Sequence, residues 1–134
     1  MTTAHSDYPA ATVPTVSKPR MDSIARDVSG EFLLELVGIF LSDVTVRVDR
    51  LVVAVAEKDH KEVYTLAHSL KGSAASLGIL RLQAHSARLE HHLSREDWDG
   101  CNRTLARLVS EFSHVREVLT AMQKRVSMRP WMQK

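Results

Sequence analysis

The chain is poor in aromatic and turn-forming residues. Aromatic residues make up 5% of its 134 residues, and the sequence holds only five glycines and four prolines. Sheet proteins draw on aromatic and turn residues, so this composition favours helices. A chain of this length is expected to form one compact domain.

Cysteines and long apolar runs are also scarce. The single cysteine, Cys101, excludes an internal disulfide framework and fits a reducing compartment. The longest apolar runs, such as residues 51–56, are far shorter than the roughly 20 residues that span a bilayer. The N-terminus also lacks the basic and apolar regions of a signal peptide. We therefore expect a cytoplasmic protein with no membrane contact.

A strong charge of one sign is missing as well. The formal net charge is +2, and lysines and arginines alternate with acidic residues along the chain. Nucleic-acid-binding proteins usually gather their basic residues on one face. We therefore expect no nucleic-acid partner.

Three spaced prolines mark the beginning of the chain. Pro9, Pro14 and Pro19 stand among small and polar residues without an apolar period, which predicts a flexible tail over residues 1–20. The folded domain is expected at residues 21–126. Residues 127–134 form a predicted C-terminal tail, since Pro130 stops the last helix.

Apolar residues at intervals of three and four predict four amphipathic helices. Ser29 is a suitable N-cap for a helix at about 30–57, and a second helix is expected at about 61–77. The third carries Leu82, Leu89 and Leu93 and ends near Ser94. The fourth has an unbroken seam of apolar residues: Cys101, Leu105, Leu108, Phe112, Val115, Leu119 and Met122. With short connections, these helices predict an all-α fold, an antiparallel four-helix bundle, with a short extra helix near residues 21–28.

One histidine in the second helix is expected to face solvent. On a helical wheel, His68 lies about 140° from the apolar direction set by Val63, and Gly72 lies about 180° from it. A glycine in a helix interior costs roughly 1 kcal/mol relative to alanine, so stability does not explain Gly72. Together with Ala75, it clears the surface for a partner that approaches His68.

The same surface offers chemistry suited to an anionic group. Lys71 lies one turn after His68 and can direct its ammonium toward a group bonded to the imidazole. Histidine is partly neutral near pH 7, as a nucleophile must be. Tyr64, one turn before His68, is expected to take part in partner docking.

Residues 67–78 carry a recognisable pattern, Ala-His-Ser-Leu-Lys-Gly-Ser-Ala-Ala-Ser-Leu-Gly, followed by Leu82 and then by Leu89 and Glu90. This sequence closely resembles the histidine-containing phosphotransfer (HPt) family, whose pattern is Ala-His-x-Leu-Lys-Gly, a second glycine six residues later and a downstream Leu-Glu pair. A weaker resemblance extends over about residues 28–122 and leaves residues 1–20 outside.

The resemblance implies a role for each matching residue. His68 would accept a phosphoryl group on a ring nitrogen, commonly Nε2, and Lys71 would help to neutralise it. Gly72 would leave room for the partner, and Gly78 matches the glycine at the following helix junction. Glu90 would face the site from the third helix of the bundle.

The resemblance also implies the partners. These would be receiver domains of response regulators and a hybrid sensor histidine kinase, with the receiver supplying an aspartate and Mg²⁺. The chain itself would need no intrinsic cofactor. Its sequence contains no glycine-rich phosphate loop and no dinucleotide-binding pattern, so we expect a phosphocarrier without its own ATP site and not an enzyme. One phosphorylatable site per bundle needs no dimer, so a monomer is expected.

Two other functions are compatible with the same helices. The first is a non-catalytic helical adaptor that binds receiver or kinase domains without phosphotransfer. The second is the phospho-accepting domain of a chemotaxis-type kinase, separated from its catalytic parts. Transfer of label to His68 would distinguish a relay from an adaptor.

Other reactive side chains are expected to be structural. His85, His91 and His92 lack the carboxylate and histidine spacing of helical metal sites, so we interpret them as solvated surface histidines and predict no metal site. Ser73 and Ser76 beside His68 have no partner that completes a hydrolytic triad. Cys101 continues an apolar seam, which favours a buried, unreactive thiol.

Overall fold

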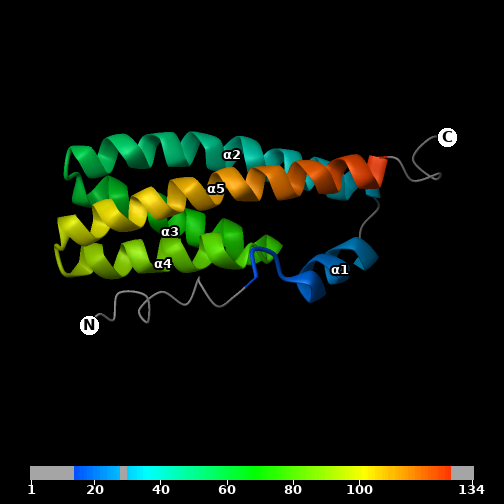
Figure 1. Cartoon of the computed structure of the whole chain (residues 1–134), viewed down its shortest axis with the longest axis horizontal. Helices are drawn as coiled ribbons and strands as arrows, with labels where there is room; N and C mark the ends of the chain where they lie inside the picture. Colours follow the sequence, from blue (N-terminus) through cyan, green and yellow to red (C-terminus); the bar gives the residue numbers. More distant parts are fainter. Residues whose placement is uncertain (1–13, 28–29, 128–134) are drawn as a thin grey trace.

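The computed structural model describes residues 14–27 and 30–127 as five helices, with no strand among these residues. In chain order the helices are α1 (Lys18–Asp27), α2 (Gly30–Ala56), α3 (His60–Leu77), α4 (Leu80–Ser94) and α5 (Trp98–Ser127). Figure 1 shows the four longer helices side by side, with α1 near the end where α2 begins. The predicted all-α bundle with a short extra helix is confirmed.

The bundle closes as a ring of four helices around one core. Helix α2 packs against α3 and α5, and α4 packs against the same two helices. Each helix contributes buried side chains at intervals of three and four residues, among them Val37, Val44, Leu51, Leu66, Leu70, Leu82, Leu89, Leu108 and Leu119. Within the described ranges, no helix has the combined length and apolarity that a membrane crossing requires.

The observed helix ends follow the predicted ones closely. The helices expected at 30–57 and 61–77 are α2 and α3, displaced by at most one residue at either end. Helix α5 begins three residues before its apolar seam, because the Asp97 carboxylate accepts a hydrogen bond from the Gly100 amide at 2.9 Å. The predicted N-cap Ser29 and the stop at Pro130 lie outside the described residues.

The predicted tail ends too late in the sequence. Helix α1 already begins at Lys18, where the Ser17 hydroxyl accepts a hydrogen bond from the Arg20 amide at 3.2 Å and so caps the first turn. Pro19 lies in that first turn, where the missing N–H of proline has no helical acceptor and costs nothing. The part of the predicted tail before residue 14 lies outside the described residues.

The segment before α1 is fastened to the junction between α3 and α4. The Ser17 amide donates to the Gly78 carbonyl at 2.7 Å, and the Leu80 amide donates to the Thr15 carbonyl at 2.9 Å. Arg20 Nε donates to the Ser76 carbonyl at 2.9 Å, which places a cation at the C-terminal end of α3. The chain before the bundle therefore anchors the end of the helix that carries His68.

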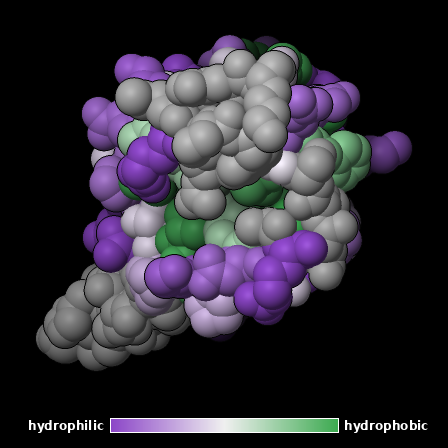
Figure 2. Space-filling model, turned by 90° about the vertical axis from the view of Figure 1, so that its right-hand side faces the viewer, coloured by the Kyte–Doolittle hydropathy of each residue, from purple (hydrophilic) through white to green (hydrophobic). Residues whose placement is uncertain are grey.

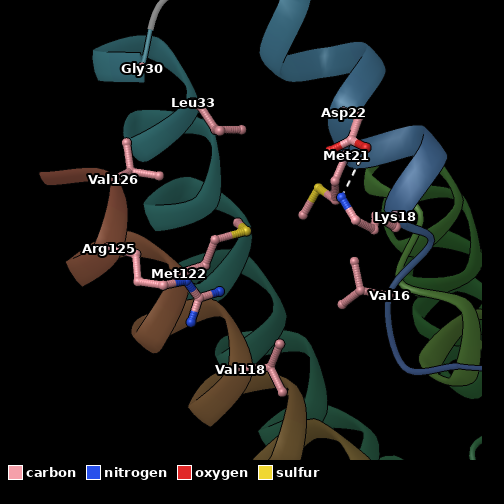
Figure 3. Close-up of a pocket in the computed structure, with 10 residues that line it drawn as sticks. All are labelled: Val16, Lys18, Met21, Asp22, Gly30, Leu33, Val118, Met122, Arg125 and Val126. Carbon is pink, nitrogen blue, oxygen red and sulfur yellow. Dashed lines mark hydrogen bonds and ion pairs between the residues drawn. The ribbon is translucent and has the colours of Figure 1, made fainter. Parts of the chain in front are cut away.

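Helix α1 partly covers one end of the bundle and leaves a groove there. Helices α2 and α5 have 27 and 30 residues and so outreach α3 and α4, which have 18 and 15. Beside α1 lies a groove of about 460 Å³ with mainly apolar walls, formed by Val16, Met21, Leu33, Val118, Met122 and Val126 (Figure 3). Figure 2 looks onto this end and shows hydrophobic surface framed by hydrophilic side chains.

Candidate functional site

Helix α3 is fixed at both ends, which determines where its side chains point. At its start, the Asp59 carboxylate accepts a hydrogen bond from the Glu62 amide at 3.2 Å. At its end, Gly78 adopts the left-handed conformation with φ of 72°, and its amide donates to the Ala75 carbonyl at 3.1 Å. A side chain at Gly78 would also collide with Arg20, since its Cβ would lie 2.8 Å from the Arg20 Cβ. This supports the predicted place of Gly78 at a helix junction.

His68 stands on the outer face of α3, with 58% of its side chain exposed. Its Nδ1 lies 3.0 Å from Oε2 of Glu90 on α4. A carboxylate can only accept a hydrogen bond, so Nδ1 carries the proton in the neutral ring and Nε2 carries the lone pair. Among the described residues, Nε2 has no protein partner. The site therefore presents one unprotonated ring nitrogen to a reactant from outside.

Glu90 connects His68 with Lys71. The Lys71 ammonium forms a close ion pair with Glu90 at 2.5 Å, through Oε1, the carboxylate oxygen that His68 does not contact. Only 13% of the Glu90 side chain is exposed, so the carboxylate meets its two partners largely shielded from water. The predicted position of Glu90 opposite the histidine is observed, and the shared carboxylate was not foreseen.

The rings of Tyr64 and His68 are stacked. The two ring centroids are 5.5 Å apart and the ring planes differ by 14°, which is a stacked arrangement. The sequence places the two residues one helical turn apart and so predicts that they are neighbours. It does not predict the angle between the rings.

The surface beyond His68 is open, as expected. Gly72 and Ala75 are exposed on α3, and no atom lies within 4 Å of the position that a Cβ at Gly72 would take. The Ser76 hydroxyl donates to the Gly72 carbonyl at 3.1 Å, which gives this serine a local structural role. The structure thus brings Tyr64, His68, Lys71 and Glu90 together and presents the small residues Gly72 and Ala75 on the same helix beyond them.

His85 is buried, contrary to its predicted place on the surface. Only 7% of it is exposed, because it follows Leu82 by three residues and precedes Leu89 by four, on the buried face of α4. The pKa of His85 is lowered from 6.5 to about 4, chiefly by burial and in part by the nearby cations Arg107 and Arg81. His91, in contrast, is exposed as predicted.

The buried His85 should make the stability of the bundle depend on pH. Because the folded protein binds this proton less readily than the unfolded chain, stability is complete above about pH 6.5 and decreases as the pH falls toward about 4. The shift corresponds to a loss of up to about 3 kcal/mol over that range. Urea unfolding of the wild type at pH 7, 5.5 and 4.5 measures this loss.

The variant His85→Asn separates this contribution from the carboxylates that also titrate at low pH. It removes the titrating ring, so we expect its unfolding free energy to change less between pH 7 and 4.5 than that of the wild type. The exposed His91→Gln is the matched control and should keep the full slope. Equal slopes for His85→Asn and the wild type would contradict the assignment.

The remaining candidate groups are structural in this fold. Within the described residues, no three histidine, cysteine, aspartate or glutamate side chains are arranged to hold a metal ion. Cys101 is fully buried, and burial raises the pKa of its thiol to about 11, so it is unreactive as predicted. His92 is less exposed than predicted, since only 19% of its side chain is accessible, and its Nδ1 lies 3.0 Å from Asp97 Oδ2 at the start of α5.

Comparisons with known proteins agree with this arrangement. Residues 35–124 match the Hpt domain family. Comparison with curated protein sequences gives no match. Among solved structures, histidine-containing phosphotransfer protein B from Pseudomonas aeruginosa PAO1 is similar with a TM-score of 0.79 and 22% identity, over 84% of this chain and 97% of that one.

Two plant proteins have similar structures. Histidine-containing phosphotransfer protein ZmHP2 from maize has a TM-score of 0.74 and 22% identity, over 84% of this chain and 86% of its own. A rice protein assigned as a histidine-containing phosphotransfer protein has a TM-score of 0.76 and 19% identity, over 98% of this chain and 93% of its own. At these identities the likeness establishes a common fold.

Proposed function

The chain belongs to the Hpt domain family and is a phosphotransfer intermediate of two-component signalling, and on this premise we propose that His68 is the residue that carries the phosphoryl group. The observation that carries the proposal is the orientation of the imidazole. Glu90 engages Nδ1 at 3.0 Å, and Nε2 has no partner among the described residues on a side chain that is 58% exposed. The nucleophilic nitrogen is thereby selected before any partner binds.

The proposed reaction is an exchange of one bond to phosphorus for another. The Nε2 lone pair forms a bond to the phosphorus of an aspartyl phosphate on a receiver domain, while the bond from phosphorus to the aspartate oxygen breaks and the aspartate leaves as a carboxylate. The proton on Nδ1 stays in place, so the ring becomes cationic. Glu90 stabilises that charge at 3.0 Å, as a carboxylate does beside a catalytic histidine. The reverse exchange passes the group to a second receiver.

Lys71 and Gly72 serve the transferred group and the partner. The Lys71 ammonium, held at the site by Glu90, is within reach of a phosphoryl group on the neighbouring ring and would offset its negative charge. Gly72 and Ala75 leave room for the receiver, and Tyr64 lies in the docking surface. Receiver domains and a hybrid sensor histidine kinase are the proposed partners, and the receiver supplies Mg²⁺.

This assignment makes the chain a phosphocarrier. We propose that it has no ATP site of its own. It would act as a monomer in the cytoplasm, where receiver domains are found. The proposal does not require a cofactor bound to this chain.

Transfer from a phosphorylated receiver tests the proposal. The protein should acquire an acid-labile, alkali-stable label, and peptide mapping should place it on His68 and not on the other six histidines. ³¹P NMR should identify the product as Nε2-phosphohistidine, since Nδ1 is engaged by Glu90. A complex that forms without any label would support the adaptor function instead, and label at Nδ1 would overturn the proposed role of Glu90.

A further inference from the structure

The side chain of Tyr64 has an arrangement that docking alone does not explain. It is a large aromatic residue with 48% exposure, yet its ring lies nearly parallel to that of His68, with a centroid distance of 5.5 Å. An exposed tyrosine on a helix is free to extend into water, and this one stacks on its neighbour four residues on. The stack lies against the ring that the proposed reaction uses.

Two contacts hold the His68 ring. The Nδ1 atom of the imidazole donates a hydrogen bond to Glu90 at 3.0 Å, which restrains the edge of the ring that carries Nδ1. The Tyr64 ring is stacked on the imidazole. Rotation about the Cβ–Cγ bond of His68 would break this stack, so the stack opposes the rotation. The hydrogen bond to Glu90 selects the nitrogen that carries the proton, and the Tyr64 stack adds a second restraint on rotation of the ring.

We propose that Tyr64 is a positioning residue that holds the His68 imidazole with Nε2 directed outward, and that its π-face stabilises the ring once phosphorylation has made it cationic. This inference rests on the proposed phosphotransfer at His68. The electron-rich face of an aromatic ring attracts a cation, whereas a neutral imidazole gains less from the same stack. The contact therefore favours the phosphorylated state over the free one.

Two substitutions separate the ring from the hydroxyl. Tyr64→Leu keeps an apolar side chain on the helix but removes the π-face, and Tyr64→Phe keeps the ring. We expect Tyr64→Leu to lower kcat for transfer from a receiver about threefold to tenfold, in addition to any rise in KM that follows from the place of Tyr64 in the docking surface. Tyr64→Phe should stay within about twofold of the wild type. Phe32→Leu on α2, which removes a ring of similar exposure far from His68 in the chain, is the matched control.

Measurements on the free protein decide the inference without a receiver. ¹⁵N NMR of His68 should show one fixed tautomer with a protected Nδ1 proton in the wild type and in Tyr64→Phe, and faster exchange of that proton in Tyr64→Leu. Labelling with phosphoramidate, a small phosphoryl donor, should give only Nε2-phosphohistidine in the wild type and some Nδ1 product in Tyr64→Leu.

The outcomes distinguish the two claims. An unchanged ¹⁵N spectrum and unchanged phosphoramidate product in Tyr64→Leu would overturn the positioning role, and a rise in KM alone would assign Tyr64 to docking. If no receiver labels the wild type, the proposed function fails, while the ¹⁵N measurement still decides whether Tyr64 orients the ring.

Discussion

Replacing His68 with glutamine should abolish phosphorylation by a receiver and leave the fold intact. The glutamine amide can still hydrogen-bond to Glu90, but its nitrogen has no lone pair available for attack on phosphorus. We expect transfer to fall by at least about 10³-fold, because the carrier atom itself is missing. With 58% of the His68 side chain exposed, the unfolding free energy should change by less than about 0.5 kcal/mol. Label transfer and urea unfolding measure the two effects.

His91→Gln is the matched control for this experiment. His91 is an exposed histidine on α4, and it lies outside the group formed by His68, Lys71 and Glu90. The variant should be labelled at the rate of the wild type. If His68→Gln were labelled at a rate near that of the wild type, another residue would carry the phosphoryl group and the proposal would be overturned.

The long helices could be predicted because their pattern has a direct physical cause. A helix that buries one face needs apolar residues every three to four positions, and α2 and α5 repeat this over seven or more turns. The start of α1 could not be read in the same way, since Pro19 resembled a tail residue. The informative signal was Ser17, which caps a first turn that tolerates proline.

The error at His85 came from weighing residue type above position. A histidine is usually exposed or half-exposed, but its spacing from Leu82 and Leu89 placed it on the buried face of α4. The periodicity that places these leucines in the core therefore also places His85 on the buried face. The consequence, a pKa lowered to about 4, depends on burial and on Arg107 from α5, and so required the tertiary structure.

The candidate site divides into a predictable part and an unpredictable part. His68 and Lys71 lie on one helix, so a helical wheel shows that they are neighbours. Glu90 lies 22 residues after His68 in the sequence, and its contact depends on how α3 and α4 are paired and rotated. Periodicity does not reveal that one carboxylate serves both the imidazole and the ammonium. That arrangement selects the reactive nitrogen, and it emerged only from the geometry.

Replacing Gly72 with glutamine should block transfer while it strengthens the helix. The position lies on the exposed face of α3, and a Cβ there meets no atom within 4 Å, so the free protein accommodates a side chain without strain. Replacing a helix-interior glycine should raise the unfolding free energy by roughly 0.5–1 kcal/mol. In the complex, the same side chain would occupy space that the receiver needs one turn from His68. We expect transfer to fall about tenfold or more, chiefly through weaker binding.

Gly72→Ala and Ser110→Gln separate the steric effect from the gain in stability. Gly72→Ala should gain a similar stability but add only a methyl group, so its transfer rate should lie between those of the wild type and Gly72→Gln. Ser110→Gln places the same long side chain on an exposed position of α5 and should leave transfer unchanged. Because stability and transfer are expected to move in opposite directions at Gly72, a stable Gly72→Gln protein with normal transfer would show that the receiver does not approach over this surface.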